Sequence, residues 1–391
     1  MMLRKKTHFF TPAILAPGTS ALLGTTQKFA LDNTWPIEEM LINVNIICGA
    51  TGPTLTGADN LLGIIKKINL SINDNNQPRS VVDCRGVALL DYCERSGFNL
   101  DADTLAAQIL CAGASIANNM AFRINYRIPL VHPAIGEPLR TRSLLPVHTW
   151  NQQPILTIEF EQGANMFSAG TLALVTAEVV LVRRNITTDL TNQILGDGGF
   201  IPFDLLETPF AIAPGVSGEQ RFAIPSPGSY LNLLMSQYLG GATVTRNVLD
   251  QAGVGAAAAS GFGAETRWRM ESGGVVDHEW RMKHLRCING FSMPKNSSTQ
   301  ASSPQLGGAV AASTSFQPAA SVMLDFLSDG VPSDGVNELG SVLDLNIPAR
   351  SGLKMEIITN VASVATNGST LFVMGHRLYG DLSKWQSVKV R

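Results

Sequence analysis

The chain has 391 residues, of which 45% are hydrophobic and 15% are charged, and its formal net charge is −2. The hydrophobic content excludes an intrinsically disordered protein, and the near-zero charge excludes a fold whose whole surface binds nucleic acid. This length allows two domains with cores of their own. The low charged fraction indicates much neutral surface, as in an ordinary β-protein with large cores or at the centre of a large subunit contact.

The chain begins with a basic segment that also carries two aromatic residues. Arg4, Lys5 and Lys6 precede Phe9 and Phe10. A histidine and two prolines interrupt the residues that follow, so no signal peptide is expected, and the prolines disfavour a long helix. Residues 1–20 are therefore predicted to form an extended N-terminal arm. Its cations and aromatics suit a membrane surface or nucleic-acid phosphates, and a solvated tail is the alternative.

The rest of the first half, residues 21–190, is predicted to consist mainly of strands, because polar and apolar residues alternate along it. The expected strands cover 27–31, 39–48, 62–72, 115–131, 155–160 and 171–182. Two short helices are predicted at 86–95 and 104–111, and Asp101 or Asp103 can cap the second. No apolar run reaches the roughly 20 residues that a membrane-spanning helix requires.

Turn-forming residues between 184 and 199 predict the connection to the second half, residues 191–391. That half repeats the same mixture of short elements. Strands or short helices are expected at 210–212, 222–224, 230–235 and 242–248, and strands at 322–327, 341–347, 354–364 and 370–379. A helix is predicted at 276–287, matching 86–95. Residues 253–263 and 292–320 are rich in small and polar residues, which predicts long surface loops.

The second half also faintly repeats the first in its sequence. Val81-Val82-Asp83 precedes Cys93 by ten residues from the aspartate, and Val275-Val276-Asp277 precedes Cys287 by the same interval. Segments 155–158 and 355–358 form a second matching pair, and Thr171-Leu172 matches Thr370-Leu371. Offsets close to half the chain length favour duplication of a whole domain over a short solenoid repeat.

Strand density, turn signals and duplication together predict an all-β fold of two tandem jelly-roll (β-sandwich) domains with short inserted helices. The arm is assigned to residues 1–20, the first jelly roll to 21–190 and the second to 191–391. A parallel sheet is not expected, because helices of regular length between the strands are absent. We expect Asp83 and Asp277 to lie at equivalent places in the two domains.

Residues capable of chemistry are sparse. The five cysteines have no CxxC spacing, which argues against a disulfide framework and favours synthesis in a reducing compartment. The cluster of His278, Glu279, His284 and Cys287 lacks the spacing of a metal site on one helix face. No nucleophile elbow or phosphate-binding loop occurs. The sequence therefore predicts no enzyme and no cofactor.

In architecture, the two tandem sandwich halves, the repeated Val-Val-Asp segments, the basic N-terminal arm and the low charge resemble double jelly-roll major capsid proteins. These proteins build tailless icosahedral viruses, many with an internal membrane, and a bacteriophage of that type fits best. The resemblance lies in architecture and not in a sequence motif, so it transfers no functional residue. It implies a homotrimer that forms a pseudo-hexagonal capsomer and tiles an icosahedral shell.

The same resemblance implies partners and a location. The partners are further copies of the chain, other capsid proteins such as a penton and minor proteins, and membrane lipid or genome through Arg4, Lys5, Lys6, Phe9 and Phe10. The location is the virion capsid after synthesis in the host cytoplasm. The alternative is a carbohydrate-binding or adhesive β-sandwich protein, such as a spike or lectin, although the tryptophans are dispersed and aromatics make up only 7%.

Overall fold

The computed structural model describes residues 6–7, 13–15, 22–56, 59–74, 77–96, 100–111, 113–131, 139–150, 152–196, 199–200, 202–216, 218–225, 228–239, 245–247, 267–272, 275–281, 321–326, 343–344, 355–361 and 368–378. The described residues up to Leu206 form one compact unit, and those from Glu207 onward form a second. The change of unit falls later than the expected boundary at 190. The predicted loops at 253–263 and 292–320 lie outside the described residues.

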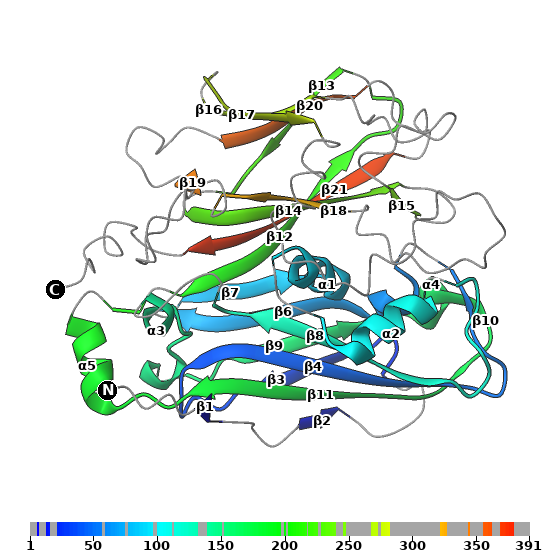
Figure 1. Ribbon diagram of the computed structural model, residues 1–391, viewed down its shortest axis with the longest axis horizontal. Coiled ribbons are helices and arrows are strands. Elements are labelled where there is room, and N and C mark those ends of the chain that lie inside the picture. Colours follow the sequence, from blue (N-terminus) through cyan, green and yellow to red (C-terminus); the bar gives the residue numbers. More distant parts are fainter. Residues whose placement is uncertain are drawn as a thin grey trace. The chain divides into compact units, whose positions relative to one another are not determined.

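The first unit is built from two sheets of mostly antiparallel strands (Figure 1). One sheet contains β1 (Lys6–Thr7) and β2 (Ala13–Leu15), both paired with β11 (Leu172–Arg184), followed by β4 (Ile37–Cys48) and β8 (Ala121–Pro129). The other has the order β7 (Gln77–Cys84), β6 (Ile65–Asp74), β9 (Ile155–Phe160) and β3 (Thr26–Ala30). A small extra sheet pairs β5 (Thr54–Leu55) with β10 (Phe167–Ala169).

Alternation along the strands produces the core of this unit. In β4, Met40, Ile42, Val44 and Ile46 are fully buried, and the residues between them are partly exposed. Because side chains of a strand alternate between its two faces, such a sequence buries one face of the sheet.

Short helices complete the first unit. They are η1 (Asn60–Gly63), α1 (Gly86–Arg95), α2 (Ala102–Cys111), α3 (Leu139–Arg142), η2 (Val147–Thr149), α4 (Gly163–Met166) and α5 (Thr188–Gly196). The helices predicted at 86–95 and 104–111 are confirmed as α1 and α2, which both contact β8. Asp101 is the cap of α2, because its carboxylate accepts a hydrogen bond of 2.7 Å from the backbone N–H of Thr104.

The segment between 184 and 199, predicted from its turn-forming residues to connect the two halves, contains the helix α5. The hydroxyl of Thr187 accepts a hydrogen bond from the backbone N–H of Leu190 at 3.2 Å, and Leu190 and Ile194 are spaced for one helix face. The helix and β1 lie at one end of the first unit, and α4 and β10 lie at the other (Figure 1).

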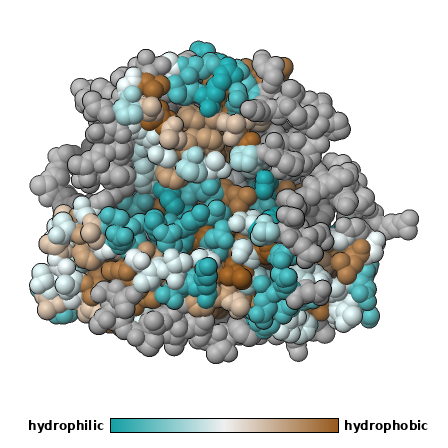
Figure 2. Space-filling view, turned by 180° about the vertical axis from the view of Figure 1, so that it is seen from behind, coloured by the Kyte–Doolittle hydropathy of each residue, from teal (hydrophilic) through white to brown (hydrophobic). Residues whose placement is uncertain are grey.

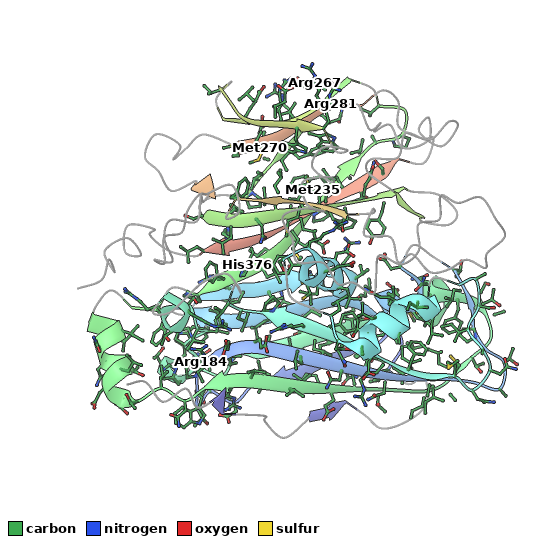
Figure 3. All side chains as sticks on the ribbon, in the orientation of Figure 1. Arg184, Met235, Arg267, Met270, Arg281 and His376 are labelled. Atoms are coloured by element: carbon green, nitrogen blue, oxygen red, sulfur yellow. The ribbon has the colours of Figure 1, made fainter. Side chains whose placement is uncertain are left out.

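The second unit also has two sheets. In one, β21 (Ser369–Leu378) lies between β12 (Phe203–Ile212) and β14 (Ser229–Leu239). The other edge of β14 pairs with β15 (Thr245–Asn247), β18 (Ser321–Asp325) and β19 (Leu343–Asp344). The second sheet has the order β13 (Gly218–Ala223), β20 (Met355–Val361), β16 (Arg267–Ser272) and β17 (Val275–Arg281). The core between them includes Trp268 and Met270 from one sheet and Met235 from the other (Figure 3).

The two units have the same strand connectivity, and each has the eight-strand order of a jelly roll. For this count, β1 and β2 are taken as one strand, and the short strands β5, β10, β15 and β19 are left out. In each unit, the first, eighth, third and sixth strands then form one sheet, and the second, seventh, fourth and fifth form the other. The predicted fold class, all-β with two tandem jelly rolls and short inserted helices, is therefore confirmed.

The sequence repeat lies on matching strands. Val81–Asp83 are in β7 and Val275–Asp277 are in β17, the fifth strand of each roll. Ser80 pairs with Ser71, and Val275 pairs with Ser272. Because Ser71 and Ser272 pair in turn with the first residues of β9 and β20, Ser80 is equivalent to Val275. The equivalent of Asp83 is thus His278, one residue beyond the expected Asp277.

The helix predicted at 276–287 is wrong for its first six residues, which belong to β17. Trp280 is buried and Glu279 is exposed, which is the alternation of a strand. Two glycines separate β16 from β17, a sequence that favours a tight hairpin. The remaining part of that prediction, residues 282–287, lies outside the described residues.

The chain leaves the first unit along β12. Leu205 and Leu206 pair in parallel with Val82 and Asp83 of β7. The fully buried carboxylate of Asp204 forms an ion pair with Arg79, also of β7. This pairing fixes the first residues of β12 onto the edge of the β7 sheet.

Replacing Gly86 at the start of α1 with alanine is expected to destabilise the first unit by roughly 1–3 kcal/mol, because the core there has no room for a methyl group. A Cβ at this position would lie 2.7 Å from the carbonyl oxygen of Ile65 and 3.0 Å from Cε1 of Tyr126. The matched control is Gly196→Ala at the end of α5, where no atom lies within 4 Å of the added methyl group. Native-state hydrogen exchange of α1 and β6 measures the difference, and equal stability of the two variants would contradict it.

Candidate functional site

The first strand of the chain, β1, lies where β11 ends, and β2 lies beside the middle of β11. Lys6 pairs with Arg184 and Thr7 with Arg183, and Ala13–Leu15 pair with residues 177–179. The described residues of the expected arm are therefore strands of the first sheet and not a separate segment. Arg4, Lys5, Phe9 and Phe10, the other residues predicted to contact membrane or genome, lie outside the described residues.

A buried carboxylate with two arginines occupies the same end. Glu38, near the start of β4, has only 7% of its side chain exposed. It accepts hydrogen bonds from Nε of Arg184 at 2.8 Å and from Nε of Arg140 at 3.0 Å. Burial opposes the ionisation of Glu38, but the hydrogen bonds and charges of Arg184 and Arg140 outweigh burial and lower its pKa. The group joins β4, β11 and α3 at one point.

A second ion pair lies beside this group. Arg183 is 3% exposed and donates a hydrogen bond of 3.0 Å to Asp32. Asp32 also accepts a hydrogen bond of 2.8 Å from the backbone N–H of Thr34. Burial raises the pKa of Asp32, but the hydrogen bonds from Thr34 and Arg183 are stronger in sum, and its pKa is lowered. Consecutive arginines of β11 are thus both bound to carboxylates that precede or begin β4.

Sequence analysis did not find these residues. Its available signals were Glu38-Glu39 before an apolar strand and Arg183-Arg184 at the end of the longest apolar run. Neither signal shows that the segments meet, because this depends on the antiparallel register of β4 and β11, in which Ile37 pairs with Arg183.

The outer face of the β13–β20–β16–β17 sheet of the second unit carries a network of arginines and glutamates. Arg221 contacts Glu219 at 2.6 Å and Glu356 at 3.0 Å, and Arg269 contacts Glu219 at 2.7 Å and Glu271 at 2.5 Å. Arg267 and Arg281 lie on the same sheet (Figure 3), and hydrophilic residues gather over it at the top of Figure 2. The face is hydrophilic and internally neutralised.

Large exposed apolar side chains are few in the described part of the chain. They are Ile109, Ile155, Leu195, Val275 and Val276, with exposed fractions from 44% to 67%. Ile155 begins β9, and Val275 begins β17. Single exposed residues of this kind are normal on a protein surface and do not by themselves mark a site.

The described residues contain no group of three or more histidines, cysteines, aspartates or glutamates that could hold a metal ion. His278 lies in β17, and His284 and Cys287 of the cluster considered above lie outside the described residues. Cys93 and Cys111 are buried, which raises the pKa of each thiol to about 12 and makes both poor nucleophiles. No helix in the described ranges is long and apolar enough to cross a membrane.

Comparison with known proteins gives no match by sequence, neither to a protein family nor to a curated protein. Comparison with solved structures gives matches over nearly the whole chain. The crystal structure of the major capsid protein of STIV has a TM-score of 0.59 and 14% identity, covering 98% of this chain and all of that one. The structure of Sulfolobus turreted icosahedral virus itself has a TM-score of 0.58 and 14% identity, covering 95% and 91%.

A third match is VP54 of PBCV-1, solved as a crystal structure and fitted into a reconstruction of the virophage Sputnik. Its TM-score is 0.55 at 11% identity, and the alignment covers 97% of this chain and 95% of that one.

The chain has the fold of double jelly-roll major capsid proteins. The double jelly roll places the Glu38 group at the end of the first roll where its first strand begins and its last strand ends. The group links β4 to β11, so its contribution to the free energy of unfolding of the first roll can be measured by substitution.

Replacing Glu38 with glutamine is expected to destabilise the first roll by roughly 3–5 kcal/mol at pH 7, because Arg140 and Arg184 lose a buried partner. The matched control is Glu159→Gln, which breaks a pair with Lys66 that is 53% and 36% exposed and should change stability by about 1 kcal/mol or less. Hydrogen exchange of β4 and β11 measures both effects.

The difference between wild type and Glu38→Gln should also depend on pH. Because the pKa of Glu38 is lowered in the folded protein, its contribution is complete above its unfolded pKa, near 4.5, and is lost as pH falls through the folded pKa. The difference in stability between the two proteins should therefore begin to shrink as pH falls below about 4.5. A difference that stays constant down to pH 3 would contradict this assignment.

Proposed function

We propose that this protein is the structural major capsid protein of an icosahedral virus. The observation that carries the proposal is the duplicated jelly roll, which aligns from end to end with a viral major capsid protein. The alignment covers 98% of this chain and all of that one. We propose no enzymatic activity, and the virion capsid is the proposed location after synthesis in the host cytoplasm.

The proposed assembly is a homotrimer. Two similar rolls in each of three subunits give six similar blocks, and such a trimer can tile a lattice with nearly six-fold edges. The low charged fraction, 15%, supports large contacts between subunits, since the centres of interfaces are depleted of charge. A penton and minor proteins are the further partners proposed for the shell.

The carbohydrate-binding alternative has less support. A glycan site on a β-sandwich usually presents aromatic side chains to solvent, and Trp268 and Trp280 are both buried between the sheets of the second roll. Trp35 and Trp150 of the first roll are partly buried. The three solved structures reported above are described as viral proteins or as a virus.

Purified protein is expected to form a stable particle of about three times the 41.8 kDa mass of the chain. Contacts within the trimer should bury more than roughly 2,000 Å² per pair, as obligate interfaces do. Mass photometry measures the mass, and negative-stain electron microscopy shows whether trimers form sheets or shells. Protein that stays monomeric at high concentration and at every salt concentration, and that binds a glycan array, would favour the alternative.

We propose that Arg4, Lys5 and Lys6 contact anionic membrane lipid or packaged genome, with Phe9 and Phe10 anchoring the segment on protein or at the lipid boundary. Each basic residue near an anionic membrane contributes about 1 kcal/mol, so three make a tether that salt weakens. The backbone pairing of Lys6 with Arg184 supports this proposal, because it fixes the last residue of the basic run at one end of the first roll.

Replacing Arg4, Lys5 and Lys6 with alanine is expected to leave the trimer intact and to weaken particle assembly and binding to anionic vesicles or nucleic acid. The control replaces Lys28, Lys66 and Lys67 with alanine. These residues lie on β3 and β6, so the control removes the same amount of charge from another part of the first roll. Co-sedimentation with each ligand at low and high salt separates lipid from genome. Equal assembly of both triple variants would remove the proposed role.

A further inference from the structure

The connection between the two rolls is attached to the first roll by a small apolar cluster of its own. Leu190 of α5 and Phe200 pack against Val131, Leu144 and Ile186. Ile194 of α5 is buried, while the neighbouring Leu195 is 51% exposed. Because this cluster is small, α5 can detach at a lower free energy than that required to unfold the sheets.

His148 of η2 lies where this connection meets the first roll. Its Nε2 is 3.4 Å from the hydroxyl oxygen of Thr191 on α5. Its ring stands edge-on to the ring of Phe200, with the centroids 5.6 Å apart and the planes at 89°. The second ring nitrogen, Nδ1, is buried and has no hydrogen-bond partner among the described residues. The contacts of the imidazole with Thr191 and with Phe200 are therefore both contacts with the segment that connects the two rolls.

This environment suits the neutral imidazole and not the imidazolium ion. In the charged form both ring nitrogens carry a proton, and the proton on Nδ1 would be buried without an acceptor. Burial accordingly lowers the pKa of His148.

The charged groups on the surrounding elements do not compensate. Arg142 of α3 donates to the carbonyl of Gly199, beside Phe200, and so brings a like charge toward this region. Arg140, also on α3, is bound to Glu38. Asp189 is exposed on α5, two residues from Thr191 and thus on a different face of the helix.

We propose that His148 is an acid-operated latch, which holds α5 and Phe200 on the first roll when the ring is neutral and releases them when it is protonated. The sheets on either side keep their own cores, so the release is local. The inference concerns the connection between the rolls and does not depend on the proposed role in a capsid.

The direction of the effect follows from linkage. A histidine with a lowered pKa in the docked state stabilises docking fully above its undocked pKa of about 6.5. As pH falls below that value, His148 binds a proton in the undocked state but not in the docked state. The opening equilibrium should then increase by up to about tenfold per pH unit, and level off once pH is below the docked pKa.

Hydrogen exchange of the full-length protein between pH 5.0 and 7.5, corrected for intrinsic rates, tests the latch. Amides of residues 190–196 should lose protection as pH falls below about 6.5, while those of β4 and β11 stay protected. In His148→Phe the ring contact with Phe200 is retained and no proton can bind, so the protection of α5 should no longer vary with pH. His148→Gln provides a second non-titrating variant if phenylalanine disturbs the packing.

A control is needed for another group that titrates in this range. Burial raises the pKa of Glu94 on α1 to about 7, so acid favours the folded state at that position, in the opposite direction. Glu94→Gln should leave the pH response of α5 unchanged. The latch is overturned if wild-type α5 has the same protection at pH 5.0 and 7.5, if the response persists in both His148 variants, or if Glu94→Gln abolishes it.

Discussion

Each roll depends on its last strand, which lies in the middle of a sheet. β11 separates β1 and β2 from β4, and β21 separates β12 from β14. The first and third strands of a roll therefore have no common sheet until the eighth strand has been inserted between them. Pairings of this range are slow to form, because the entropy of closing a long loop opposes them until most of the chain is in place. The fold is held by contacts that no local segment can make alone.

The ionic contacts of the first roll occur where this insertion ends. Arg183 and Arg184 are the last residues of β11, and each is bound to a carboxylate that precedes or begins β4. Arg183 and Glu38 are withdrawn from solvent, with 3% and 7% of their side chains exposed, so either one left alone would be a buried charge. Their arrangement specifies register as well as stability, because a shift of β11 by one residue would put Val182 in the place of Arg183 or Asn185 in the place of Arg184.

The architecture could be predicted from sequence because the local alternation of polar and apolar residues indicates where the strands lie. Alternation in β4 and β11 and the helix at 86–95 required no knowledge of the rest of the fold. Three features were missed for physical reasons. Residues 6–7 and 13–15 are strands because they pair with β11. The helix α5 is fixed by its contacts with Val131 and Leu144, and Val275–Arg281 is short enough for helix and strand patterns to agree. The Glu38 group depends on register between distant segments, which composition cannot reveal.

The hairpins that join the fourth and fifth strands show how the two rolls have diverged. The pair of Ser71 with Ser80 in the first roll is equivalent to the pair of Ser272 with Val275 in the second. In the first roll the strand pairing continues beyond this point as far as Asp74, which pairs with Gln77. The added residues come in opposed pairs, so the strands behind them keep the same side chains facing the core. The hairpin can therefore be lengthened or shortened by pairs of residues, one on each strand, without disturbing the packing of either sheet. The tip of the β6–β7 hairpin is accordingly a place where a peptide tag or epitope can be grafted onto the molecule.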